Sequence, residues 1–120
     1  MLEKLTQQEE AAMRAVWTTG EGNVKTFLEN MEPPLPPYTT LASTIKNLEK
    51  KNYLSSRLVG NMYLYQPAVE EWEYKKQFLT HMVKHHFDNS YKDLVAFFAE
   101  QKKISPKELK EIIEMIEKKK

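Results

Sequence analysis

Four prolines within five positions constrain the fold of this chain more than any other feature of its sequence. They are Pro33, Pro34, Pro36 and Pro37. Proline has no backbone N–H and disfavours a helical conformation at the residue before it, so a helix cannot continue across residues 33–36. Apolar residues recur at helical spacing on both sides. We therefore expect separate helices joined by a stiff, extended connector. A contact surface for a partner is the alternative role of this connector.

Three helices are predicted before residue 52. The first begins at Thr6-Gln7-Gln8-Glu9, which has the form of a capping box, and it ends at Gly20. Asn23 is a suitable N-cap for a second, short helix that carries its own apolar stripe. The third helix follows the prolines and ends at Lys51. The Glu9-Glu10 pair is expected to be a solvated part of the first helix.

A β-hairpin is predicted after the third helix. Residues Tyr53–Val59 and Met62–Tyr65 are rich in β-branched and aromatic side chains, and Gly60-Asn61 between them has the form of a tight turn. Three helices followed by a hairpin is the connectivity of a winged helix–turn–helix domain. We therefore assign residues 1–69 to such a domain, in a fold that is mainly α with one β-hairpin.

From residue 70 onward the sequence returns to helical spacing and predicts three more helices. Asp88-Asn89-Ser90 interrupts the pattern, and Ser105-Pro106-Lys107-Glu108 restarts it with a capping box. So short a segment rarely buries a core of its own, whereas a second copy would cover its wide apolar stripes. We therefore predict that residues 70–120 form a dimerisation domain, with folding back onto the N-terminal domain as the alternative. The predicted interface residues are Leu94, Val95, Phe98, Leu109, Ile112, Ile113 and Ile116.

The third helix has the surface expected of a helix that enters the major groove of DNA. Leu41, Ile45 and Leu48 share one face, and the opposite face presents hydroxyl, amide and ammonium groups but no carboxylate. Such groups bond to base edges and phosphates. From Lys46 to Arg57 the chain has four basic residues and one acidic residue, although its overall net charge is only +1. The candidate base contacts are Thr39, Thr40, Ser43 and Asn47. The candidate phosphate contacts are Tyr38, Lys46, Lys50 and Arg57, and Asn61 is expected at the tip of the hairpin.

Several strings of residues, in this order, carry a resemblance to a known family. They are Leu5-Thr6-Gln7-Gln8-Glu9, Tyr38-Thr39-Thr40-Leu41, Leu48-Glu49-Lys50-Lys51-Asn52-Tyr53-Leu54 and Gly60-Asn61-Met62-Tyr63-Leu64-Tyr65-Gln66-Pro67. Together they resemble the BlaI/MecI/CopY family of bacterial repressors, also called the penicillinase repressor family, over nearly the whole chain. The resemblance implies a homodimer that binds an inverted-repeat operator in double-stranded DNA and represses transcription. We expect such a repressor to be cytoplasmic.

The resemblance also implies how repression could end. Well-studied members are inactivated when a signal from a membrane sensor-protease leads to cleavage in the C-terminal domain. The equivalent bond in this chain is Phe97-Phe98, where Phe97 stands in place of the Asn that precedes the cleaved bond in those members. The copper-responsive branch uses a C-terminal Cys-x-Cys pair. This chain contains no cysteine, which excludes that mechanism.

Other functional classes have little support in the sequence. No Gly-x-Ser-x-Gly motif and no glycine-rich loop is present, so we predict that the protein is not an enzyme and uses no cofactor. His81 and His85 have a spacing that can share a metal ion, but no His-Glu-x-x-His motif accompanies them, and we assign no metal site. No apolar run is long enough to cross a membrane, and the N-terminal residues lack the pattern of a signal peptide. The alternative function is a winged-helix protein-interaction module that docks a partner on the Pro33–Pro37 connector.

Overall fold

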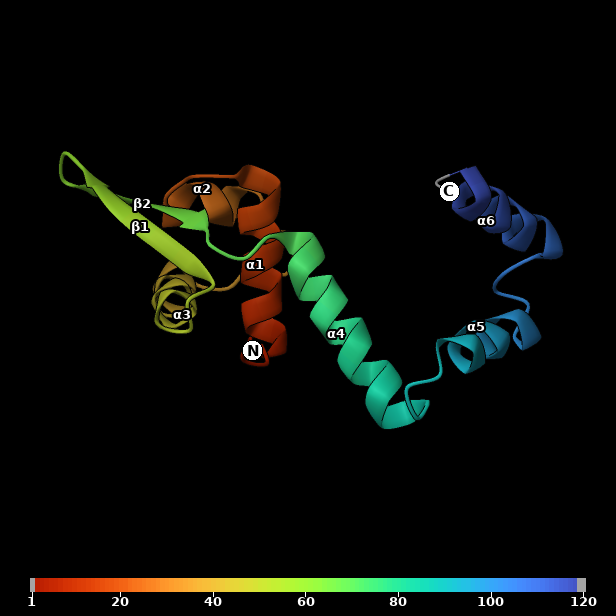
Figure 1. Ribbon diagram of the computed structural model, residues 1–120. Helices are drawn as coiled ribbons and strands as arrows, with labels where there is room; N and C mark the ends of the chain where they lie inside the picture. The colour runs from red at the N-terminus through yellow and green to blue at the C-terminus, as the bar shows by residue number, and fades with distance from the viewer. Residues whose placement is uncertain (1, 119–120) are drawn as a thin grey trace. The chain divides into compact units, whose positions relative to one another are not determined.

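The structure is a computed structural model that describes residues 2–118, and this part of the chain contains six helices and two strands (Figure 1). In chain order the elements are α1 (Gln7–Thr19), α2 (Val24–Glu29), α3 (Tyr38–Lys50), β1 (Leu54–Val59), β2 (Met62–Pro67), α4 (Glu71–His86), α5 (Tyr91–Glu100) and α6 (Pro106–Lys118). By its internal contacts the chain divides into two compact units, one ending at Gln77 and the other beginning at Phe78. No helix among the described residues is long and apolar enough to span a membrane.

Local hydrogen bonds fix the ends of the N-terminal helices where the sequence predicts them. The Glu9 N–H donates to Thr6 Oγ1 at 3.1 Å and the Thr6 N–H donates to Glu9 Oε1 at 2.9 Å, which completes the capping box of α1. Gly20 ends that helix with a φ of 83°, in the left-handed region that favours glycine. Asn23 Oδ1 caps α2 by accepting from the Thr26 N–H at 2.8 Å. Asn52 follows α3 with a φ of 67°, the left-handed conformation expected after a helix end.

The two strands pair antiparallel around the turn Gly60-Asn61. Leu54 lies opposite Pro67 at the base of the hairpin and Val59 lies opposite Met62 at its end. The predicted second strand stops two residues short of the one observed. The loop between α1 and α2 adds a bridge to β2, in which the Gly22 and Tyr65 backbones exchange hydrogen bonds of 3.0 and 2.8 Å. The hairpin is therefore attached along β2 to the helical part of the domain.

One hydrophobic core joins the first three helices to the base of the hairpin. α3 buries Leu41, Ile45 and Leu48 in it, the face that the spacing predicts. Tyr53, placed at the start of the first strand by the sequence pattern, instead lies just before β1 with its side chain fully buried. The other fully buried large side chains of this core are Phe27, Met13 and Val16. Packing on one side of α3 leaves its polar side open to solvent.

The second unit contains the C-terminal part of α4 together with α5 and α6. Ser90 Oγ caps α5 by accepting from the Asp93 N–H, and the predicted capping box between Ser105 and Glu108 opens α6. Among the described residues of this unit, Val83 alone has a buried apolar side chain. The mainly α fold with one hairpin, a winged helix–turn–helix followed by a helical region, is thus confirmed.

Candidate nucleic-acid interface

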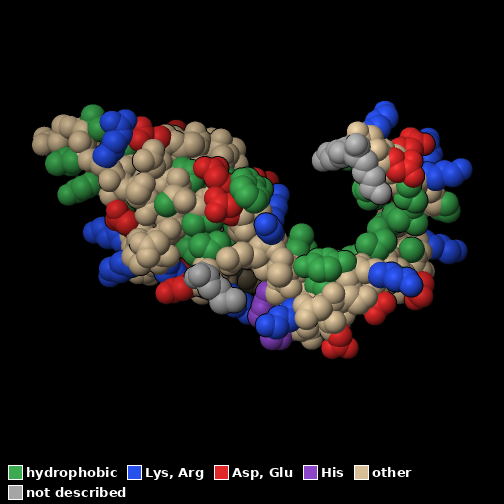
Figure 2. All heavy atoms as spheres, viewed as in Figure 1, with side chains coloured by type: hydrophobic (Ala, Val, Ile, Leu, Met, Phe, Trp, Pro, Cys, Tyr) green, Lys and Arg blue, Asp and Glu red, His purple; other side chains and the backbone are tan. Residues whose placement is uncertain are grey.

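The outward face of α3 gathers the polar residues that the sequence assigned to it. Its exposed residues include Thr39, Ser43, Lys46, Asn47 and Lys50, and Thr40 is half-buried beside them. Tyr38, at the start of the helix, is 54% exposed. Figure 2 shows Lys and Arg side chains gathered over α3. The one carboxylate of this helix, Glu49, accepts a hydrogen bond from the Ser56 hydroxyl of β1. That bond ties α3 to the hairpin.

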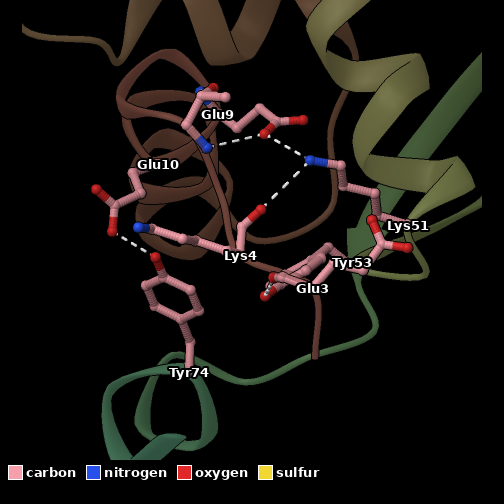
Figure 3. A network of polar contacts seen from close by, with 8 residues as sticks. Glu3, Lys4, Glu9, Glu10, Lys51, Tyr53 and Tyr74 are labelled. Atoms are coloured by element: carbon pink, nitrogen blue, oxygen red, sulfur yellow. Dashed lines mark hydrogen bonds and ion pairs between the residues drawn. The ribbon is translucent and has the colours of Figure 1, made fainter. Parts of the chain in front are cut away.

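A network of polar contacts holds the C-terminal end of α3 against α1 (Figure 3). Lys51 Nζ lies 2.8 Å from Glu9 Oε1 and 3.4 Å from the carbonyl oxygen of Lys4. Glu9 is buried, so the expectation that it is solvated is wrong. Burial by itself would raise the pKa of the Glu9 carboxyl, but hydrogen bonds from Lys51 and Thr6 outweigh it and hold the pKa below its ordinary value. The capping box predicted the bonds between Glu9 and Thr6, whereas the pairing with Lys51 depends on the packing of α1 with α3.

Arg57 is bound by a carboxylate that the sequence analysis did not identify. Its Nε donates to Glu21 Oε2 at 2.8 Å, and its Nη2 donates to Glu21 Oε1 at 2.7 Å. The hydrogen bond from Arg57 lowers the pKa of the Glu21 carboxyl. Arg57 lies opposite Leu64, on the hairpin face that is turned away from Ser56 and α3. The structure therefore does not bring Arg57 together with the polar face of α3. No sequence pattern relates positions 21 and 57, because their contact depends on the Gly22–Tyr65 bridge.

Internal ion pairs reduce the basic charge available to a ligand. Of the four basic residues between Lys46 and Arg57, Lys51 pairs with Glu9 and Arg57 pairs with Glu21. Lys46 and Lys50 are exposed and take part in none of the ion pairs between described residues. The positive charge therefore lies on α3 itself, next to its hydroxyl and amide groups. This combination can bind phosphates and read base edges.

Asn61 occupies the place that the sequence predicted for it. It lies in the two-residue turn between the strands and is exposed. Its amide is thus available at the end of the hairpin.

The first turns of α4 pack with the N-terminal unit. The Tyr74 hydroxyl donates to the Glu10 carboxylate of α1, and the Tyr74 ring lies 5.7 Å from Trp17 and 5.9 Å from Tyr53 between centroids. The Trp17 indole N–H donates to the carbonyl of Val69 at 2.9 Å. Burial, together with the bond to Glu10, raises the pKa of Tyr74. The division between the two compact units therefore falls inside α4.

The residues predicted for a dimer interface lie on α5 and α6. Exposed among them are Val95, Phe98, Ile112, Ile113 and Ile116, whereas Leu94 and Leu109 are half-buried. Phe97 and Met115 add further exposed apolar surface. Exposed apolar side chains grouped on one face of a helix make that face a candidate contact surface.

The remaining candidate residues also lie on helices. Phe97 and Phe98, at the proposed cleavage site, are near the end of α5, with ring centroids 5.5 Å apart. His81 and His85 are exposed on α4, with ring centroids 4.2 Å apart. Among the residues that the structure describes, no three His, Asp or Glu side chains are grouped as metal ligands.

The sequence was compared with known protein families and with curated proteins. The sequence profile of the penicillinase repressor family matches residues 5–118. The chain belongs to the penicillinase repressor family. A search of curated proteins found no match. Members of the penicillinase repressor family are transcriptional repressors and not enzymes, and the polar face of α3 on a winged helix–turn–helix is consistent with DNA binding.

Proposed function

We propose that this protein is a homodimeric, sequence-specific repressor that binds an inverted-repeat operator in the cytoplasm. The observation that carries the proposal is the exposed face of α3, which offers hydroxyls, an amide and two lysines without a competing carboxylate. Thr39, Thr40, Ser43 and Asn47 contact base edges in the major groove. Tyr38, Lys46 and Lys50 contact phosphates, and binding at two half-sites blocks access to the promoter.

The second unit supports the dimer in this proposal. Val83 is the one buried apolar side chain among its described residues, which is too little to stabilise three helical segments against the loss of chain entropy. A second copy packed on Ile112, Ile113 and Ile116 would bury the apolar face of α6. Dimerisation also joins two DNA-binding domains, so that two half-sites about one helical turn apart, or a multiple of it, are bound together.

Selection from a pool of random duplex DNA tests the proposal. The purified protein is incubated with the pool at near-physiological salt, and the bound sequences are determined. Enrichment of a palindrome is the expected result, because each half-site is read by one copy of α3. Absence of any enriched sequence, with the protein folded and dimeric, would overturn the proposal.

Substitutions on α3 separate base contacts from phosphate contacts. Ser43→Ala or Asn47→Ala should change the preferred base at one position per half-site, by about 1–3 kcal/mol for a bidentate contact. Lys46→Ala should weaken binding to every sequence about equally. If the Ser43 and Asn47 variants keep the wild-type preference, the assignment of base contacts is wrong.

We further propose that cleavage at Phe97-Phe98, triggered by a membrane sensor-protease, ends repression. Both residues are helical and exposed near the end of α5, so the last turn must unwind before a protease can bind the chain in extended form. Mass spectrometry of the intact protein, taken from cells in which repression has been relieved, tests this proposal. The expected products are one fragment that ends at Phe97 and another that begins at Phe98.

The alternative function has one observation in its favour. A shallow groove of about 430 Å³ runs along the proline connector, lined by Met31, Pro34, Leu35, Pro36 and Leu41 among others. A partner protein docked there would make the chain an interaction module. That function predicts no salt-dependent binding of duplex DNA.

A further inference from the structure

The hairpin of this protein carries little charge. Arg57 is its one charged residue between Leu54 and Pro67. Near its end, Leu58 and Tyr63 are 58% and 57% exposed. They lie directly opposite each other on the two strands and so form one cross-strand pair. An exposed pair of large apolar side chains on a projecting hairpin either contacts a partner or lowers the solubility of the protein.

The strand register places this pair on the same side of the hairpin as α3. Side chains two residues apart on a strand share a face, so Leu58 lies on the face of Ser56, whose hydroxyl bonds to Glu49 of α3. Tyr63 likewise lies on the face of Tyr65, whose side chain is buried against the core. Figure 2 shows hydrophobic side chains along the hairpin and Lys or Arg side chains over α3 on the same edge of this unit.

The opposite face of the hairpin makes two contacts within the protein, although Val59 and Met62 on it are also exposed. Arg57 is held there by Glu21, and the Asn23 amide donates to Met62 Sδ at 3.1 Å. The charge of the hairpin is therefore both neutralised and turned away from α3. A ligand that contacts α3 and the hairpin together meets lysines on the helix. On the hairpin it meets Leu58, Tyr63 and the amide of Asn61, and no charged group.

The chemistry of duplex DNA fits this division. Phosphates line the edges of its grooves, whereas the walls of the minor groove, which lies beside the major groove, are formed largely by deoxyribose. Proteins that bind the minor groove insert apolar side chains between its base steps. When α3 lies in the major groove, the face of the hairpin that carries Leu58 and Tyr63 is turned toward the adjacent part of the duplex. Asn61, in the turn, offers amide donors to the acceptors on the edges of A·T pairs.

We propose that Leu58 and Tyr63 form an apolar contact with the sugar-lined wall of the DNA groove, so that the hairpin adds affinity without contacting phosphates through charge. This inference rests on the proposed function, because it requires α3 to bind duplex DNA. It makes a distinctive prediction. An apolar contact releases no counterions, so it strengthens binding without changing the dependence of affinity on salt.

The test compares Leu58→Ser and Tyr63→Ser with Val59→Ser. Val59 is also exposed, but it lies next to Leu58 on the opposite face of the hairpin, which makes it a matched control. Affinity for a labelled, mixed-sequence duplex of about 30 base pairs is measured from about 50 to 200 mM salt, the range over which phosphate contacts change affinity steeply. Thermal unfolding of each variant checks that the fold is intact.

The expected result is a loss of about tenfold in affinity for the Leu58 and Tyr63 variants, the size expected when part of a large apolar side chain loses its burial. Their slope of log affinity against log salt should equal that of the wild type, and Val59→Ser should bind as the wild type does. Lys46→Ala, measured alongside, should instead flatten the slope by about one unit.

Three other outcomes are informative. If all three hairpin variants bind DNA with the affinity of the wild type, the inference is wrong. Leu58 and Tyr63 would then be available as a contact for another protein. A loss that comes with a flatter salt slope also overturns the inference, because the substitution has then displaced the lysines of α3. If the wild-type protein binds no duplex even at about 50 mM salt, the proposed function itself fails, and the result is distinct from the other two.

Discussion

Lys51 Nζ lies 2.8 Å from Glu9 Oε1 and thereby joins the residue that follows α3 to the first turn of α1. Glu9 also closes the capping box of α1 through the Thr6 N–H. The same buried carboxylate therefore caps the N-terminus of α1 and binds the residue that follows the C-terminus of α3. The Glu9–Lys51 pair thus adds a polar contact to the apolar packing that holds α3 against α1.

Glu9→Gln should destabilise the protein by about 1–3 kcal/mol at neutral pH, because it removes a charged partner from a nearly buried hydrogen-bonded pair. The pKa of Glu9 lies below the ordinary value of 4.5 in the folded protein. Its ionised form thus contributes stability above that pH, and the contribution is lost as the pH falls through the lowered pKa. Urea unfolding at pH 7 and pH 3 measures both effects.

A suitable control for the Glu9 variant is Glu71→Gln. Glu71 forms an exposed pair with Lys75 at 3.6 Å, and such pairs contribute little. The free energy of unfolding of this control should lie within about 0.5 kcal/mol of the wild-type value. If the two variants differ by no more than that, the Glu9–Lys51 pair does not stabilise the domain.

Tyr74→Phe should lower the stability of the N-terminal unit by about 1 kcal/mol, since it leaves the Glu10 carboxylate without the Tyr74 hydroxyl. The pKa of Tyr74 is raised above its ordinary value of 10.0 by burial and by Glu10. A raised pKa means that the folded state holds its proton more tightly, so stability declines as the pH rises above about 10. Urea titrations at pH 9 and pH 11 should show a smaller loss of stability between the two pH values for this variant than for the wild type. The control, Tyr91→Phe at an exposed position, should lose as much stability as the wild type does.

The phosphate contact predicted for Arg57 can be tested with a charge-neutral double substitution, Glu21→Gln with Arg57→Gln. The pair has no net charge before or after the change. Because Arg57 lies on the hairpin face turned away from α3, we expect the salt dependence of duplex binding to stay at the wild-type slope. A slope flatter by about one unit would show instead that Arg57 leaves Glu21 and binds a phosphate in the complex.

Ile113→Asp should convert the proposed dimer to monomers, because it places a charge on the exposed apolar face of α6. Glu111→Lys, at an exposed position on the opposite side of the same helix, is the control and should leave the dimer intact. Sedimentation velocity at micromolar protein reports the mass of each variant. A monomeric wild type, or an Ile113 variant that stays dimeric, would contradict the role given to this face.

Sequence reasoning was most reliable where the structure depends on neighbouring residues. The capping boxes at Thr6 and Ser105, the N-cap at Asn23 and the turn at Gly60-Asn61 involve groups at most a few positions apart. The buried face of α3 follows from the period of the helix alone. Local geometry is sufficient in each of these cases.

The sequence by itself determined the order of the elements, the winged helix–turn–helix connectivity and the polar face of α3. Tertiary structure decided which charges are free. Glu9 and Lys51, like Glu21 and Arg57, are far apart in the chain and meet only after helices and strands have packed. The tertiary structure also decided that Leu58 and Tyr63 lie on the same side of the hairpin as α3, whereas Arg57 lies on the other side. Alternate side chains of a strand point to opposite faces, and only the packed domain shows which of these faces adjoins the helix.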